Sequence, residues 1–289
     1  MRYLVLGPGR SGTTAVARAI EIAAGPQVEV FFEPRGLASV RSEASSSTVV
    51  AKILVERWLP ADRQHMDWFD RRIFIARDPR DVVISRLLYQ VYAMQFIHDP
   101  KKLEEFLTAL RAKEQSPGEH TVQSLFDLVA RLEGTDNGLA LTARFHRKAV
   151  KLWRATHDTM HLLRYEDFVD GRTEDLSAYL GLAVTEHPDV APRWQRVTRT
   201  RSHGNWKHWF TAADDELVSR TFRDYLDVFG YDDWVKPAEQ IIDPEHSSEY
   251  VKRIVRLAHR RRARALRRLV GGDSRPRRET SSPSAPPLS

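Results

Sequence analysis

Short apolar runs alternate along this chain with longer segments whose apolar residues recur every three or four positions. Five runs of strand length lie at 3–6, 28–32, 48–55, 72–76 and 160–164. Uninterrupted runs of this kind are typical of strands buried on both faces, as in a parallel sheet. The longer segments have the spacing of amphipathic helices. The pattern therefore predicts an α/β fold: a P-loop-like parallel sheet flanked by helices, with a helical insertion at 101–160 on the substrate side.

Glycines interrupt the pattern directly after the first predicted strand. Residues 7–14 are GPGRSGTT, and a helical pattern follows them. A glycine-rich loop between strand and helix directs backbone N–H groups and a helix N-terminus at an anion. Gly7 and Gly12 have the spacing of a Walker phosphate loop, but Thr13 stands where its lysine would be, and the nearby cation is Arg10. The alternative is a plain strand–turn–helix connection without a ligand.

Charged residues also end the second and fourth predicted strands, at the edge where parallel sheets place their chemistry. Glu33 ends the second strand, and a solvated loop carboxylate is the alternative interpretation. Arg77 ends the fourth strand, and Ser85 lies in the helix that follows. An arginine fork and a hydroxyl at one edge suit a phosphate group. We expect the neighbouring Arg80, in contrast, to pair with a carboxylate such as Asp81.

The basic character of the chain is concentrated at its end. The chain has 45 Lys and Arg and 39 Asp and Glu, a net charge of +6. Residues 251–289 hold twelve of the basic and two of the acidic residues, so the first 250 residues hold 33 and 37, a net charge of −4. The excess of basic residues therefore predicts a partner for the tail and not a ligand of the core.

The predicted organisation is a main domain at 1–235, a linker at 236–248, a basic amphipathic helix at 249–270 and a disordered tail at 271–289. The amphipathic helix suits peripheral contact with an anionic membrane, and a solvated basic extension is the alternative. We expect no nucleic-acid partner.

Cysteine is absent, which excludes disulfides and thiolate chemistry and fits a reducing compartment. No signal-peptide pattern and no run of membrane-spanning length is present. We therefore expect a cytoplasmic protein, peripheral at the inner face of a membrane if the basic helix binds there. The histidines lack metal-ligand spacing, so no metal site is expected.

Four motifs together resemble the sulfotransferases that use 3′-phosphoadenosine 5′-phosphosulfate (PAPS). GPGRSGTT at 7–14 is similar to their 5′-phosphosulfate loop, and RDPRDVVIS at 77–85 to their 3′-phosphate motif. LRYEDF at 163–168 is similar to a segment after the penultimate core strand. RSHGNWKHWF at 201–210 resembles the C-terminal loop that closes over the nucleotide. The motifs occur in family order, and the resemblance is nearer to the bacterial and carbohydrate-type members than to the cytosolic type.

This resemblance implies metal-independent, in-line transfer of a sulfuryl group from PAPS to a hydroxyl or amine. Arg10 stands where the family often has lysine and would neutralise charge that grows on the leaving phosphate. The 5′-phosphosulfate would be held by the loop residues Gly9, Arg10, Ser11, Gly12, Thr13 and Thr14. The 3′-phosphate would be held by Arg77 and Ser85, under a cover formed by Arg201, Ser202, His203 and Gly204.

The acceptor must lose a proton, which requires a general base. Many family members have a histidine two residues after a strand lysine, but Lys52 is followed by Ile53 and Leu54. Carbohydrate-acting relatives often use a glutamate, so Glu33 is the predicted base, with His65 as the second candidate. The sequence does not identify the acceptor; we expect a small molecule, a carbohydrate or a lipid-linked molecule.

Two other functions fit part of the pattern. A P-loop kinase or phosphotransferase would need the Walker lysine that Thr13 replaces, and a carboxylate that holds Mg²⁺. A non-catalytic nucleotide-binding module with a membrane-binding tail would need only the phosphate-binding residues.

Overall fold

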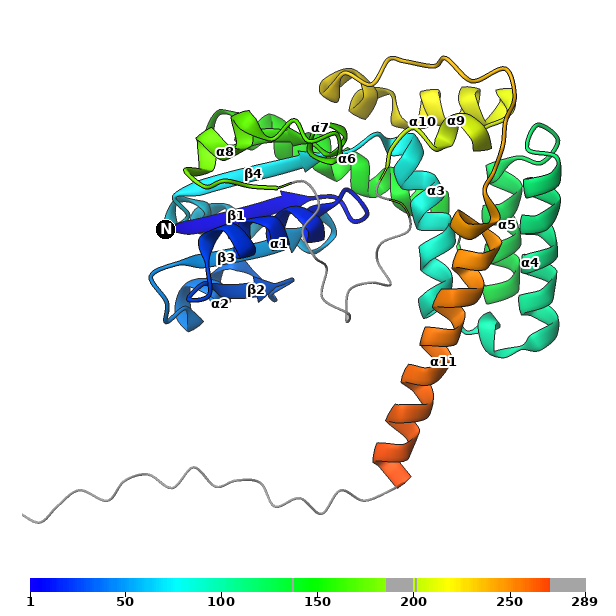
Figure 1. The fold of residues 1–289 in the computed structure, drawn as a ribbon, viewed down its shortest axis with the longest axis horizontal. Coiled ribbons are helices and arrows are strands. Elements are labelled where there is room, and N and C mark those ends of the chain that lie inside the picture. Colours follow the sequence, from blue (N-terminus) through cyan, green and yellow to red (C-terminus); the bar gives the residue numbers. More distant parts are fainter. Residues whose placement is uncertain (137, 186–199, 201, 271–289) are drawn as a thin grey trace, which may run out of the picture.

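The computed structural model describes residues 1–136, 138–185, 200 and 202–270 (Figure 1). Its centre is a five-stranded sheet in the order β2-β3-β1-β4-β5, with every neighbouring pair parallel. The strands are β1 (Arg2–Gly7), β2 (Glu29–Phe32), β3 (Val49–Leu54), β4 (Arg71–Ala76) and β5 (His161–Arg164). The predicted α/β class, a parallel sheet flanked by helices, is confirmed.

Alternation of side chains along the strands divides the core into two layers. Tyr3 and Val5 of β1 face one layer, whereas Leu4 and Leu6 face the other. The first layer is covered by α1 (Thr13–Ala24), α7 (Tyr165–Val169) and α8 (Glu174–Leu180). The second, larger layer is covered mainly by α3 (Pro79–Gln90), α6 (Gly138–Thr156) and α10 (Ala212–Phe229). Both faces of the sheet are therefore buried, which explains the uninterrupted apolar runs.

The order of the strands fixes where a ligand would bind. The chain leaves β1 toward β2 at one edge of the sheet and leaves β4 toward β5 at the other edge. β1 and β4 are neighbours, so the segments that follow them diverge and open a crevice at their carboxyl ends. The glycine-rich loop and Arg77 therefore begin on adjacent strands.

The remaining helices extend the second layer. They are α2 (Leu37–Glu43), α4 (Pro100–Gln115), α5 (Val122–Glu133), α9 (Trp206–Trp209) and α11 (Ser248–Val270). Short 3₁₀ segments are η1 (Val55–Arg57), η2 (Pro60–Trp68), η3 (Val91–Ala93), η4 (Phe96–His98), η5 (His157–Thr159) and η7 (Pro244–His246). Among the helices described, none combines the length and the apolar character needed to cross a lipid bilayer.

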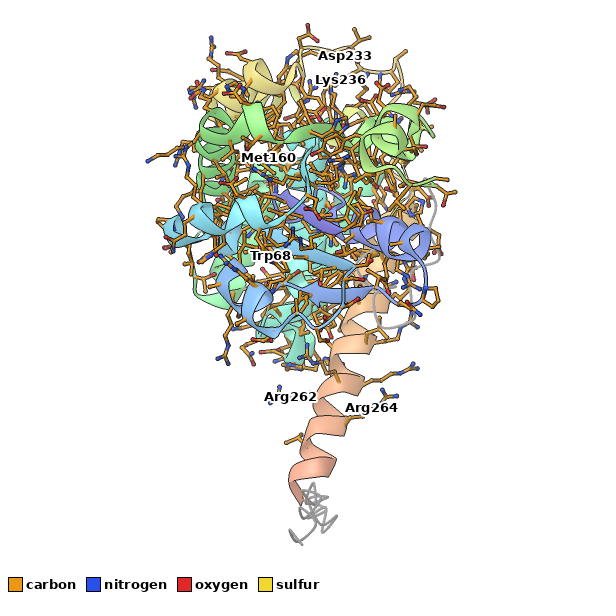
Figure 2. All side chains as sticks on the ribbon, turned by 90° about the vertical axis from the view of Figure 1, so that its left-hand side faces the viewer. Trp68, Met160, Asp233, Lys236, Arg262 and Arg264 are labelled. Carbon is orange, nitrogen blue, oxygen red and sulfur yellow. The ribbon has the colours of Figure 1, made fainter. Side chains whose placement is uncertain are left out.

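The two halves of α11 have different surroundings. In its first half Tyr250, Ile254 and Val255 are buried in the same core as the sheet and α3. Its second half extends away from the rest of the chain, and Arg262 and Arg264 lie there in solvent (Figures 1 and 2). The apolar face of the expected basic helix is therefore used, in its first half, to attach the helix to the main domain.

Candidate active site

The loop after β1 has an unusual backbone. Gly12 has a φ of 89°, and Arg10 has a φ of 73°. Arg10 and Glu33 are the two non-glycine residues with positive φ in the described part of the chain. Such conformations raise the energy of a non-glycine residue and concentrate at functional sites. The two residues that the sequence assigns to catalysis thus have the two strained backbones.

The N-terminus of α1 is open to an anion. Gly12 occupies the position before the helix and supplies no side-chain cap, and the first turn contains no acidic residue. Ser11 is turned inward, where its backbone N–H and its hydroxyl both donate to the carbonyl of Pro8 at 3.2 and 2.7 Å. Thr13 is buried and Thr14 is half-buried. The first amides of α1 consequently point at the space beside the loop.

Arg10 reaches across to α3. Its Nε donates to the Ser85 hydroxyl at 3.0 Å, and its guanidinium lies 4.2 Å from the centroid of the Tyr89 ring. Its backbone carbonyl accepts a hydrogen bond from Nη1 of Arg77 at 3.0 Å. The structure therefore brings Arg10, Ser85 and Arg77 together at the carboxyl ends of β1 and β4.

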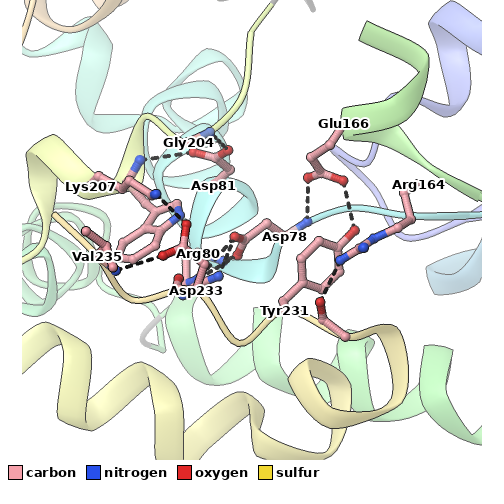
Figure 3. A network of polar contacts seen from close by, with 12 residues as sticks. Asp78, Arg80, Asp81, Arg164, Glu166, Gly204, Lys207, Tyr231, Asp233 and Val235 are labelled. Atoms are coloured by element: carbon pink, nitrogen blue, oxygen red, sulfur yellow. Dashed lines mark hydrogen bonds and ion pairs between the residues drawn. The ribbon is translucent and has the colours of Figure 1, made fainter. Parts of the chain in front are cut away.

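The residues after β4 anchor the start of α3. Asp78 caps this helix by accepting from the backbone N–H of Arg80 at 2.9 Å. The Arg80 guanidinium forks onto the same carboxylate (Figure 3). It also lies 4.0 Å from the centroid of the Trp206 ring and 4.4 Å from that of the Trp234 ring. Arg80 does pair with a carboxylate, but that carboxylate is Asp78 and not Asp81. Burial raises the pKa of Asp78 to about 6, and Arg80 opposes that shift.

Asp81 instead holds the C-terminal loop. Its carboxylate accepts from the backbone N–H groups of Gly204 and Trp206 at 2.6 and 3.0 Å (Figure 3). This contact brings the carbonyl of Ser202 to within 3.5 Å of Nη2 of Arg77. The His203 imidazole pairs with the Asp170 carboxylate at 2.9 Å. Arg201 lies outside the described residues.

Glu166 joins the network from the start of α7. One carboxylate oxygen accepts from the backbone N–H of Asp78 and the other from the Tyr231 hydroxyl, both at 2.9 Å (Figure 3). The segment at 163–168 thus supports the end of β4, and its Tyr165 ring also contacts the guanidinium of Arg77.

Arg77 is a buried cation without a carboxylate partner. Its side chain is 6% exposed, its guanidinium lies 4.2 Å from the Tyr165 ring centroid, and its Nε has no hydrogen-bond partner. In the part of the chain described, no carboxylate lies within ion-pair distance of it. Burial acts to lower the pKa of Arg77, but Tyr165 and the carboxylates of Asp81, Glu166 and Asp78 raise it overall.

Those three carboxylates are each engaged by other groups, as described above. Their negative charges therefore act on Arg77 through space, but none of them forms an ion pair with it. Burial of a charge is unfavourable unless the charge is paired. A buried guanidinium without a carboxylate partner, beside the uncapped N-terminus of α1, fits a phosphate group.

A second charged group lies at the ends of β2 and β3. Lys52 is 1% exposed and pairs with the Glu33 carboxylate at 2.5 Å, and Arg57 approaches the other oxygen at 3.3 Å. Burial lowers the pKa of Lys52, and Glu33 opposes that shift. Two cations thus orient the Glu33 carboxylate at the same edge of the sheet as the loop. His65 lies on η2, and among the described residues no hydrogen bond or ion pair links it to this group or to Arg77.

Glu56 and Arg86 belong to the site although the sequence did not indicate them. The backbone N–H of Gly9 donates to both Glu56 oxygens, at 2.9 and 3.0 Å. Arg86, on α3, approaches the same carboxylate at 3.4 Å. Glu56 lies on η1, where no strand or helix period marks it, whereas Arg86 follows Ser85 directly and could have been suspected. The first amide of the loop is therefore held by a carboxylate of the protein itself.

Comparisons with known proteins find similarity among solved structures and not among sequences. No protein-family model matches the chain, and no curated protein matches its sequence. Among solved structures, the chain is similar to the crystal structure of mouse sulfotransferase SULT7A1 complexed with PAP. The two are 15% identical with a TM-score of 0.48, and the similarity covers 78% of this chain and 84% of that chain. Function is therefore inferred below from the contacts of the site residues.

Gly12→Ala should damage the loop more than its backbone angle alone explains. A Cβ at Gly12 would lie 2.2 Å from the Tyr165 ring, which packs on Arg77. Gly134 has a similar φ of 74° with nothing within 4 Å, so Gly134→Ala is the matched control. We expect a loss of unfolding free energy of about 1–2 kcal/mol for Gly134→Ala and about 1–3 kcal/mol more for Gly12→Ala, by urea titration. Equal losses would show that the ring yields without strain.

Proposed function

We propose that this protein is a sulfotransferase that moves a sulfuryl group from PAPS to a hydroxyl or amine of an acceptor. The observation that carries the proposal is Arg77, a buried guanidinium without a carboxylate partner, in contact with the carbonyl of Arg10. A nucleotide with phosphates at both its 3′ and 5′ positions presents two anionic groups to these two elements. The uncapped N-terminus of α1 suits the 5′ group, and Arg77 with Ser85 suits the 3′ group.

PAPS supplies a sulfuryl group attached to a phosphate that can leave. The acceptor oxygen or nitrogen forms a bond to sulfur, the bond from sulfur to the bridging oxygen breaks, and the acceptor proton passes to a base. Arg10 neutralises the charge that develops on the leaving phosphate. Because an arginine stays protonated, it can act by charge but not as a proton donor.

Glu33 is the base that we propose. Its carboxylate is oriented by Lys52 and Arg57 at the sheet edge that also carries the loop. A kinase reading is less well supported, because Thr13 occupies the position of the Walker lysine. A non-catalytic nucleotide-binding module would need neither the strained Glu33 nor its two cations.

The proposal predicts that Arg77→Ala weakens binding of adenosine 3′,5′-bisphosphate. The loss of a charged hydrogen bond should reduce affinity by about 1.5–3 kcal/mol, roughly 10- to 150-fold, in a calorimetric titration. Arg77→Lys keeps the positive charge without the planar fork. Its affinity for the bisphosphate should therefore lie between that of the parent and that of Arg77→Ala. Unchanged affinity in Arg77→Ala, with the variant still folded, would contradict the assignment of the 3′-phosphate.

A second prediction distinguishes the role of the Glu33 carboxylate from that of the Glu56 carboxylate. Glu33→Gln should leave bisphosphate affinity unchanged and lower turnover of PAPS by about 10²–10⁴, because the general base is lost. Glu56→Gln is the matched control, with the same change of charge at a neighbouring carboxylate, and should lower turnover by less than about tenfold. Full turnover in Glu33→Gln, or the larger loss in Glu56→Gln, would assign the base elsewhere.

The exposed half of α11 is proposed to touch an anionic membrane. Arg260, Arg261, Arg262 and Arg264 are all exposed there, and Leu266 is 53% exposed beside them. Figure 2 shows Arg262 and Arg264 clear of the rest of the chain. Basic residues near an anionic lipid surface are attracted by about 1 kcal/mol each.

This contact is tested by sedimentation with vesicles. The full chain should bind vesicles that contain phosphatidylserine and should not bind vesicles made only of phosphatidylcholine. The triple variant Arg260→Gln, Arg261→Gln and Arg264→Gln should lose about 3 kcal/mol of the binding free energy to phosphatidylserine vesicles. Equal binding by parent and variant would exclude α11 as the contact.

A further inference from the structure

Helix α6 has a high density of positive charge. Its 19 residues include Arg144, Arg147, Lys148, Lys151 and Arg154 and no Asp or Glu. The first 250 residues of the chain, in contrast, carry a net charge of −4. The positive charge of α6 is therefore a local feature and does not reflect the composition of the domain.

Four of these cations form a single line on the surface, which we call the α6 stripe: Arg144, Arg147, Lys151 and Arg154. All four are exposed, and their spacing of three, four and three residues places them on one side of the helix. At 1.5 Å per residue the stripe is about 15 Å long. Like charges three or four residues apart repel one another and lower the stability of the helix.

The stripe is not neutralised by the protein. Some exposed arginines elsewhere do pair with nearby acids, as in Arg111 with Glu104 and Arg172 with Asp167. No member of the stripe has a carboxylate within ion-pair distance among residues 1–136, 138–185, 200 and 202–270. Its counter-charges must therefore come from solvent ions or from a ligand.

The Arg144 end of the stripe borders the candidate active site. The Phe145 ring lies 4.9 Å from the guanidinium of Arg86 and 5.6 Å from that of Arg144. Arg86 in turn contacts Glu56, which holds the first amide of the loop. A chain of direct contacts thus leads from the loop to Arg144.

The side of α6 next to the stripe is fixed to the segments that follow β3. The Lys148 ammonium donates to the carbonyl of Trp58 at 2.8 Å. Near the other end of the helix, Nη2 of Arg63 donates to the carbonyl of Ala155 at 3.1 Å. The stripe accordingly starts beside the site at Arg144 and leads away from it along the domain to Arg154.

We propose that the α6 stripe binds the acceptor, and that the acceptor is an extended anionic oligosaccharide with several sulfate or carboxylate groups. This rests on the proposed function, because only a transferase has an acceptor at this edge. Four point charges along about 15 Å match a chain with repeated anionic groups better than a compact molecule with one.

The test uses fluorescence anisotropy with a labelled, sulfated maltotetraose as the probe. The protein is the full chain, with and without adenosine 3′,5′-bisphosphate. The stripe variant carries Arg144→Gln, Arg147→Gln and Lys151→Gln. The control variant carries Lys101→Gln, Arg220→Gln and Arg223→Gln, three exposed cations on α4 and α10 that also lack ion pairs in the described structure. Unsulfated maltotetraose and a thymidine tetranucleotide are the comparison ligands.

We expect the parent to bind the sulfated probe and not the neutral one. The stripe variant should bind it at least tenfold more weakly, whereas the control variant should change by less than threefold. Equal losses in the two variants, no binding by the parent, or equally tight binding of the tetranucleotide would each overturn the proposal. The bisphosphate titration separates the two proposals: if the bisphosphate does not bind, the proposed function fails, while the comparison of variants still reports on the stripe.

Discussion

The hydrogen bond from Arg77 to the backbone carbonyl of Arg10 is the contact on which the site depends. It joins the ends of β1 and β4, the two strands whose outgoing connections diverge. It also places a buried cation against the loop that ends in the uncapped N-terminus of α1. A cation in that position attracts an anion that the described protein groups do not supply, and this is the physical reason to expect a ligand there.

The rest of the structure keeps this cation available. Asp78 is occupied by Arg80, Asp81 by the amides of the C-terminal loop, and Glu166 by an amide and a tyrosine hydroxyl. The acids of the RDPRD segment therefore support the fold around Arg77 without neutralising it. Arg77 and Arg80 have different partners because of their positions. Arg80 lies in the first turn of α3 and pairs with the capping residue Asp78, whereas Arg77 precedes that turn.

Much of this could be predicted from the sequence, because buried parallel strands leave uninterrupted apolar runs and glycine-rich loops are conspicuous. All five strands, the loop, and the positions of Arg10, Arg77 and Ser85 relative to it were accessible in this way. Helix α2 was not, because with seven residues and two buried side chains it is too short to show a period. Glu56 was not, because the contact between η1 and the loop exists only in three dimensions. For the same reason the sequence could not show that Asp78, and not Asp81, would pair with Arg80.

The most direct test of the central claim compares two ligands on the unaltered protein. Calorimetric titration with adenosine 3′,5′-bisphosphate and with adenosine 5′-monophosphate isolates the 3′-phosphate, the group assigned to Arg77. The account predicts that removal of this phosphate weakens binding at least about tenfold, the effect of one charged hydrogen bond. Equal affinity for the two ligands, or tighter binding of ATP with Mg²⁺ than of the bisphosphate, would contradict it.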